Sequence, residues 1–170
     1  MFKTIKKLFK RAWNWRLRKK WHVIPFMLIT FIVIFLVFYN FHFTLTESLN
    51  RNFFYIDTRF PQVKIGDYVT LDVTYPYGEI PEDIRVTKII ACMYGQYLQV
   101  NGLKFYCDGD YIGEAKEETM SGKKTRVFQY DGLIPYGKLF LMGPHEYSFD
   151  SKYFGLVEVT KLKMLLKPVF

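Results

Sequence analysis

Histidine and cysteine are scarce in this chain, and their scarcity removes several kinds of active site from consideration. The 170 residues include three histidines and two cysteines. The cysteines form no Cys-x-x-Cys motif, and no histidine stands at a spacing from them that a zinc site would use. We therefore expect neither a metal ion nor another cofactor.

Acidic residues are absent from the N-terminal segment, although the whole chain has 16 of them. Residues 1–20 hold nine basic residues, and the other 150 residues hold 15 basic and 16 acidic ones. The formal net charge of +8 thus comes from a tail, and the rest of the chain is close to neutral. Nucleic-acid binding is typical of a domain with a basic face, so this distribution argues against a nucleic-acid partner.

Charged residues are missing altogether from residues 23–46. About 20 apolar residues cross a bilayer as a helix, and aromatic residues flank this stretch on both sides, as they do at membrane interfaces. The alternatives are a buried core helix and a cleaved signal peptide, although a signal peptide ends at a small-residue site that is absent here. We expect a basic cytoplasmic tail at residues 1–22, a transmembrane helix at residues 23–43 in contact with lipid, and an exported domain at residues 44–170.

Beyond the uncharged stretch the pattern favours β-strands, and no segment shows a convincing helical period. Residues 97–102 lead into residues 103–113 as a hairpin with Asn101-Gly102 as its turn, and the polar residues 112–124 indicate an exposed loop between strands. Other alternating or β-branched runs occupy residues 67–75, 84–94, 125–132, 138–143 and 154–166. We predict a mainly β fold, with a single β domain tethered by one N-terminal helix.

Cys92 and Cys107 lie 15 residues apart in the part that we expect to be exported. Two interpretations stand: one disulfide bond, or two buried thiols. The even count and the oxidising compartment favour the disulfide.

Three polar islands could carry chemistry. Ser48 follows the uncharged stretch, where a nucleophile would sit at the membrane surface, although serine is also common at helix ends and turns. Lys88 lies within an apolar strand between Val86 and Ile90, which share its face. Such a lysine either guards a strand edge or is buried, in which case its pKa falls towards neutrality and it can act as a general base for a serine.

The third island is "SFDSKYFG", residues 148–155. Ser148, Asp150 and Lys152 alternate, so in an extended backbone they point the same way. Asp150 and Lys152 could then form an ion pair, and the Ser148 hydroxyl could orient another polar group. The interleaved aromatic residues would pack on the opposite side and hold this support rigid.

The three islands, in this order, resemble bacterial signal peptidase I and more closely the TraF-type peptidases of conjugative transfer systems. That family has a serine box after its membrane anchor, a lysine box in a strand, and a late Ser-x-Asp-Ser-Arg box. The matching stretches here are "TESLNRNFF", "TKIIACMYG" and "SFDSKYFG". Lys152 stands where the family usually has arginine, and a lysine cannot form the same two-pronged bond with Asp150.

The resemblance implies a mostly β signal-peptidase fold and a serine endopeptidase in the bacterial inner membrane, with its catalytic domain outside the cytoplasm. Carried over residue by residue, it makes Ser48 the nucleophile and Lys88 its base, with Ser148 orienting the amine. Thr46 and the Ser48 backbone N–H would form the oxyanion hole, and Asp150 and Lys152 would support the site. The substrate would be the leader peptide of an exported precursor, with pilin maturation in conjugation as one such role.

Two other interpretations remain from the sequence. The chain could be a non-catalytic, membrane-tethered component of a secretion or conjugation machine, docking on other components of that system. It could also be a Ser–His hydrolase that uses His145, although no orienting acid is evident beyond the adjacent Glu146.

Overall fold

We describe a computed structural model of the chain, which defines residues 23–43, 53–57, 62–76 and 82–169. It divides into two compact units, Met1–Asn40 and Phe41–Phe170. In the first unit, helix α2 (Val23–Asn40) has no charged residue, and it is apolar and long enough to cross a membrane. Pro25 lies in its first turn, where a proline breaks no backbone hydrogen bond within the helix.

The helix ends three residues earlier than we predicted. Residues 41–43 form strand β1 (Phe41–Phe43), which pairs antiparallel with β2 (Phe53–Asp57). Phe41 stacks on Phe53 with ring centroids 4.8 Å apart. Aromatic residues favour strands when a partner is present, and that tertiary pairing outweighs the uncharged character that had suggested a continuing helix.

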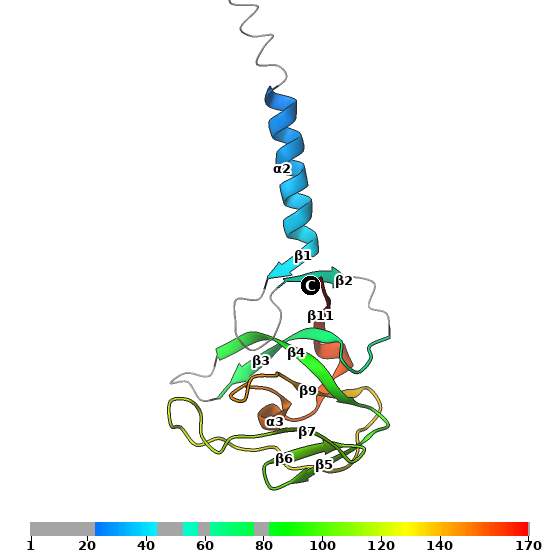
Figure 1. Ribbon diagram of the computed structural model, residues 1–170, viewed down its shortest axis with the longest axis vertical. Helices are drawn as coiled ribbons and strands as arrows, with labels where there is room; N and C mark the ends of the chain where they lie inside the picture. The colour runs from blue at the N-terminus through cyan, green and yellow to red at the C-terminus, as the bar shows by residue number, and fades with distance from the viewer. Residues whose placement is uncertain (1–22, 44–52, 58–61, 77–81, 170) are drawn as a thin grey trace, which may run out of the picture. The chain divides into compact units, whose positions relative to one another are not determined.

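The second unit is mainly β, as the sequence predicted, and its strands pair antiparallel. A seven-stranded sheet has the order β1-β2-β11-β3-β4-β9-β10, and a four-stranded sheet has the order β7-β6-β5-β8. Figure 1 shows α3 (Ser151–Phe154) at a level between β9 of the first sheet and β7 of the second. The remaining strands are β3 (Tyr68–Tyr75), β4 (Glu82–Met93), β5 (Tyr97–Asn101), β6 (Lys104–Cys107), β7 (Asp110–Glu114), β8 (Asp131–Leu133), β9 (Lys138–Met142), β10 (Val157–Glu158) and β11 (Leu162–Pro168).

Strand β4 links the two sheets and positions the site described below. Its first part pairs with β3 from Glu82 to Ile89, and its last part pairs with β9 from Ile89 to Met93. Cys92 of β4 forms a disulfide with Cys107 of β6, with the two Cα atoms 5.9 Å apart. The disulfide lies within an apolar cluster that also includes Leu98, Phe105 and Phe140, so it joins the two sheets inside their shared core.

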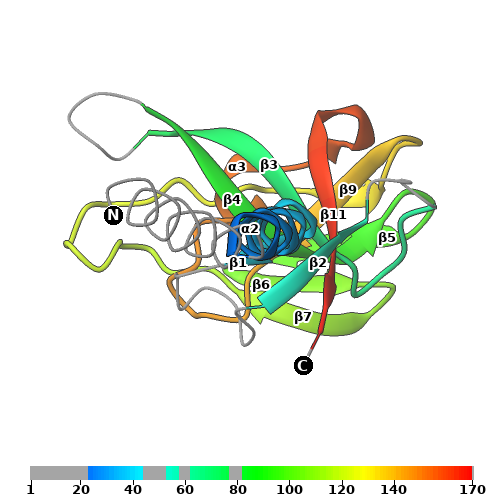
Figure 2. The same ribbon diagram turned by 90° about the horizontal axis from the view of Figure 1, so that it is seen from above.

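The edge of β4 that faces away from β3 has no strand partner before Ile89 among the residues that the structure describes. Strand β9 pairs with β4 only from Ile89 onward, and after Met142 the chain turns away into a loop. Figure 2 shows β3 and β4 extending together beyond the region where β9 lies. An open antiparallel edge of this kind presents backbone N–H and C=O groups that can pair with another chain.

Two of the predicted strands differ in detail from the structure. Residues 154–166 are not one strand but contain β10, a 3₁₀ turn (Val159–Lys161) and the start of β11. β10 pairs with β9, whereas β11 lies between β2 and β3, so the chain must cross the sheet between them. Of residues 125–132 only the last two belong to β8, because the Phe128 N–H bonds to the Lys152 carbonyl instead of to a strand.

The predicted hairpin is present, but its turn lies one residue later than expected. Asn101 pairs with Lys104, so the two turn residues are Gly102 and Leu103. Gly102 has φ of +63°, a conformation that glycine adopts readily and that suits the first turn position of a tight hairpin.

Candidate active site

Lys88 is buried on the core face of β4. Its side chain is only 3% exposed, and Val69, Leu71 and Ile90 form the apolar cluster on the same face of the sheet. Burial lowers the pKa of the Lys88 amine from 10.5 to about 8; Asp150 opposes this shift and Lys152 adds to it. Near neutral pH the amine can therefore lose its proton far more readily than an exposed lysine.

Ser148 accepts a hydrogen bond of 2.6 Å from the Lys88 amine. The two residues are 60 positions apart in the chain, and both are buried. Gly143 makes their approach possible, since a Cβ there would overlap Ser148 Oγ and lie 3.3 Å from Lys88 Nζ. Any larger residue at position 143 would displace the hydroxyl that holds the amine.

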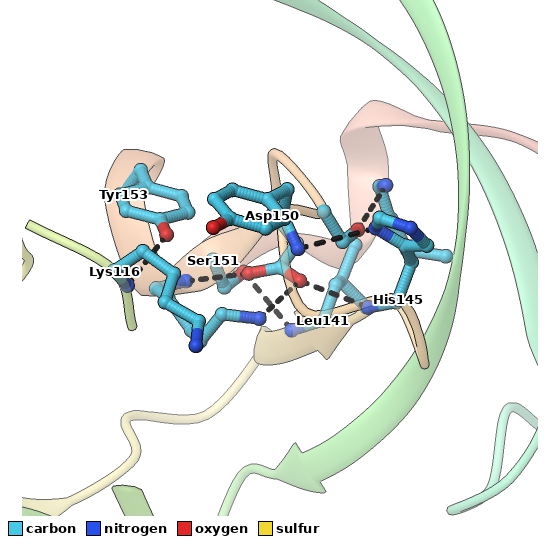
Figure 3. A network of polar contacts seen from close by, with 11 residues as sticks. Lys116, Leu141, His145, Asp150, Ser151 and Tyr153 are labelled. Atoms are coloured by element: carbon cyan, nitrogen blue, oxygen red, sulfur yellow. Dashed lines mark hydrogen bonds and ion pairs between the residues drawn. The ribbon is translucent and has the colours of Figure 1, made fainter. Parts of the chain in front are cut away.

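Asp150 is the centre of a second polar cluster, beside the first. Its Oδ2 accepts hydrogen bonds from Lys152 Nζ at 2.7 Å and from the Gly143 N–H at 2.9 Å, and its Oδ1 accepts from the Lys152 N–H at 3.0 Å. Asp150 and Lys152 are both almost completely buried. Figure 3 shows Asp150 with Lys116 and Tyr153 on one side and His145 on the other. The carboxylate thus fixes Gly143 and the late box together.

The backbone of this late box differs from our prediction. We expected residues 148–152 to be extended with three side chains pointing one way, but Asp150 caps a single helical turn, α3. A short aspartate that bonds to a backbone N–H two residues later is a common helix N-cap. Gly155 ends the turn with φ of +80° beneath the Phe128 ring, where a Cβ would be too close. The turn places Asp150 and Lys152 in contact, although by a different route from the one predicted.

Two residues of this network were not singled out from the sequence. Ser151 Oγ accepts a hydrogen bond of 2.9 Å from the Leu141 N–H of β9, which anchors α3 to the sheet. Lys116 donates its backbone N–H to Tyr153 Oη at 2.9 Å and forms an ion pair of 2.9 Å with Glu146. Neither residue has a sequence signal of its own. Ser151 stands between Asp150 and Lys152, which already accounted for that segment, and Lys116 lies in a polar loop.

Among the described residues, the hydrogen bonds of His145 are both to backbone groups of its own loop. Its Nδ1 accepts a hydrogen bond of 3.2 Å from the Tyr147 N–H. Its carbonyl accepts a bond from the Ser148 N–H, so the residue helps to form the turn that carries Ser148. These bonds assign His145 a role in loop shape.

Two cavities lie beside the loop that connects β9 to α3. One, of about 230 Å³, includes Tyr147 and Phe149 among its lining residues, which flank Ser148. The other, of about 490 Å³, is lined by Gly143, Pro144 and His145 together with residues of β7. There is thus open space on both sides of the segment that holds the Lys88 amine.

Ser48 and Thr46, the predicted nucleophile and oxyanion-hole residue, lie outside the residues that the structure describes. The described residues bring together the other four predicted site residues, Lys88, Ser148, Asp150 and Lys152. Within the same described ranges, no group of histidine, cysteine, aspartate and glutamate side chains could hold a metal ion.

Comparisons with known proteins agree with the sequence resemblance at the level of the family. Residues 17–165 match the family described as signal peptidase, peptidase S26. A solved structure of signal peptidase I from Enterococcus faecalis V583 is similar, with 19% sequence identity and a TM-score of 0.42, over 63% of this chain and 98% of that chain. No curated protein matches the chain. Because the family match extends over most of its length, the chain belongs to the S26 signal peptidase family, whose membership indicates a serine endopeptidase acting on the leader peptides of precursor proteins.

Proposed function

We propose that this protein is a membrane-bound serine endopeptidase in which Ser48 is the nucleophile and Lys88 is the general base. The observation that carries the proposal is the state of Lys88: a buried amine, hydrogen-bonded to a hydroxyl, with its pKa lowered to about 8. A buried lysine that serves only structure usually has a carboxylate partner. The nearby carboxylate of Asp150 is instead bound by Lys152 at 2.7 Å.

The proposed reaction follows from that arrangement. The neutral Lys88 amine takes the proton of Ser48 Oγ as the oxygen attacks the scissile carbonyl, and the new oxyanion is stabilised by the Ser48 N–H and the Thr46 hydroxyl. The protonated amine then gives its proton to the leaving amine as the peptide bond breaks. Water, activated by the same amine, hydrolyses the acyl-enzyme and restores Ser48. Ser148 keeps Nζ aligned through both steps.

The open edge of β4 offers a way to hold the substrate. Before Ile89 this edge has no strand partner within the described residues, and it leads along the backbone to Lys88. An extended leader peptide can add to such an edge as a further strand, with its backbone hydrogen bonds fixing the register of the scissile bond. This mode suits a peptidase that must accept many leader sequences.

We place the protein in the bacterial inner membrane, with residues 1–22 in the cytoplasm and the β domain outside. The nine basic residues before α2 support this orientation. Treating intact spheroplasts with a protease is expected to degrade residues 44–170, as detected with an antibody to the β domain. Protection of that domain until the membrane is opened would contradict the orientation.

The finer assignment is to the TraF-type peptidases, with a pilin precursor of a conjugative transfer system as substrate and components of that system as partners. It is supported by the stretch from "VNGLKFYCDGDYIG" to "IPYGKLFLMG" between the lysine box and the late box, which resembles the TraF group. A purified pilin precursor is the direct probe.

The central test is processing of a precursor by the full-length protein in detergent micelles. Ser48→Ala and Lys88→Ala are each expected to remove nearly all cleavage, because neither member of the dyad works alone. Lys163→Ala, which changes an exposed lysine of β11, is the matched control and is expected to retain activity. Near-normal cleavage by either dyad variant would make the assignment wrong and favour a non-catalytic role.

A further inference from the structure

Residues 117–125 form an ordered hairpin, and all but the last of them belong to the polar stretch that the sequence predicted as an exposed loop. Glu118 and Lys124 pair as an isolated antiparallel bridge. The Thr119 N–H bonds to the Lys123 carbonyl at 2.8 Å, and Thr119 Oγ1 accepts a bond of 3.1 Å from the Lys123 N–H. The Thr125 hydroxyl bonds to the Lys116 carbonyl. The hairpin therefore uses its own polar groups to define its shape.

This hairpin forms one wall of the 230 Å³ cavity, and aromatic side chains form the rest. The Tyr75 and Phe149 rings meet edge to face with centroids 5.0 Å apart, and Phe149 stacks on Tyr153 at 6.1 Å. Met120 at the tip of the hairpin is 80% exposed and Tyr147 is 40% exposed. A cavity of about 150 Å³ in another protein holds one benzene molecule, so this cavity has room for one large apolar side chain.

The cavity lies beside the segment that carries Ser148. Tyr147 and Phe149 precede and follow Ser148, whose hydroxyl is 2.6 Å from the Lys88 amine. Tyr75 lies opposite Glu82, at the far end of the open edge of β4. Figures 1 and 2 both show the hairpin on the side of the domain towards which β3 and β4 project. A peptide along this edge would pass the cavity.

We propose that this aromatic cavity is a specificity site, which takes one aliphatic or aromatic side chain of the precursor near the scissile bond. Met120 and Tyr147 are its specificity-determining residues. The occupant is apolar because four aromatic rings and one thioether contribute to the lining. The hydroxyls of Thr119, Ser121 and Thr125 also line the space, but each already has a hydrogen-bond partner. Glu118 is the one charged residue of the lining. This inference rests on the proposed function, since it assumes that a peptide chain reaches Lys88.

The test uses a set of internally quenched peptides that all contain the same Ala-x-Ala cleavage site. At each position flanking this site in turn, one peptide has phenylalanine and a second peptide has serine. The ratio of kcat/KM for the two residues is measured with the full-length protein in micelles. At one position we expect wild type to prefer phenylalanine, and Met120→Ala and Tyr147→Ala each to reduce that preference about fivefold, mainly through KM. Tyr136→Ala, which removes an exposed aromatic residue near the opposite end of β9, is expected to leave the ratio unchanged.

A second measurement separates failure of this inference from failure of the proposed function. Met120→Cys is combined with Ser48→Ala, and its rate of alkylation by a maleimide is followed with the phenylalanine or the serine peptide present. We expect the phenylalanine peptide to slow alkylation at least severalfold more than the serine peptide.

The outcomes divide clearly. Cleavage of the peptides with an unchanged phenylalanine preference in both cavity variants would overturn the specificity site and leave the peptidase intact. No cleavage of any peptide by wild type would contradict the proposed function, and the cavity would then be judged by alkylation alone. Equal alkylation with both peptides would overturn the cavity proposal in either case.

Discussion

Two buried lysines, Lys88 and Lys152, lie in neighbouring parts of this protein and differ in their hydrogen-bond partners. Lys88 is 3% exposed and Lys152 is 2% exposed, so both amines are removed from water. Lys152 has a carboxylate, that of Asp150, at 2.7 Å. Lys88 has the hydroxyl of Ser148 at 2.6 Å. The two lysines are thus equally buried, but the partner of Lys152 is a charged carboxylate and the partner of Lys88 is a neutral hydroxyl.

The comparison shows how a protein can lower the pKa of a buried lysine. A hydroxyl orients the amine without supplying a charge that would hold its proton, so desolvation dominates and the pKa of Lys88 falls to about 8. The Asp150 carboxylate raises the Lys88 pKa and the Lys152 ammonium bound to it lowers that pKa, so burial decides the direction of the shift. We infer that the Asp150–Lys152 pair fixes the loop while its two charges act on Lys88 in opposite directions.

Breaking the ion pair is expected to give the largest effect on stability. Asp150→Asn leaves the Lys152 amine buried without a counter-charge and weakens the cap of α3, so the free energy of unfolding should fall by about 3–5 kcal/mol in denaturant titrations. Asp72→Asn, which breaks the exposed pair with Arg85, is the matched control and should cost far less stability, because solvent screens that pair. Equal losses in the two variants would mean that the buried pair contributes no more than the exposed one.

Removing the amine of Lys88 is expected to raise the free energy of unfolding near neutral pH, whereas breaking the ion pair lowers it. With the folded pKa at about 8 and the ordinary value at 10.5, the unfolded chain binds the extra proton between these values, so this lysine costs stability below about pH 8. The cost is on the order of 3 kcal/mol near pH 7 and disappears above about pH 10.5. Lys88→Met should therefore be as stable as wild type or more so near neutral pH.

The difference between Lys88→Met and wild type should shrink as the pH rises from about 8 to about 10.5, because other titrating groups are common to both proteins. Denaturant unfolding at several pH values measures it. A variant that is clearly less stable than wild type at every pH would show that Lys88 is a structural partner.

The smallest effect is expected from removing the Ser148 hydroxyl, which orients the Lys88 amine. Ser148→Ala should lower the cleavage rate about tenfold, the size of one lost hydrogen bond, while activity still rises with pH through the Lys88 pKa of about 8. Thr160→Ala, which removes an exposed hydroxyl that lines neither cavity, is the control. His145→Ala should leave the pH profile unchanged; if it removed the rise, the histidine and not Lys88 would be the base.

Much of this site could be predicted from the sequence because its residues stand out against their surroundings. A lysine among β-branched residues and an aspartate among aromatic residues are rare combinations, and each predicts burial with a partner. The strands were predictable from a different signal. Polar and apolar residues alternate in β3, and β4 and β9 contain apolar runs.

What could not be predicted depends on contacts between distant segments. The helical turn at α3 forms because Asp150 caps it and Ser151 bonds to Leu141 of β9. The strand at residues 41–43 exists because Phe53–Asp57 lies beside it. Gly143 has no sequence signal at all, since its need for a missing Cβ arises only when Ser148 approaches.

The separation of 60 residues between Lys88 and Ser148 has a consequence for when the protein becomes active. Joining two points so far apart requires closing a long loop, and such contacts form slowly compared with local ones. Until the late box docks on β4, Lys88 is an ordinary protonated amine on a partly formed sheet. Under the proposed mechanism, a newly made chain therefore has no working base during its own synthesis, and proteolytic activity begins only when the fold is complete.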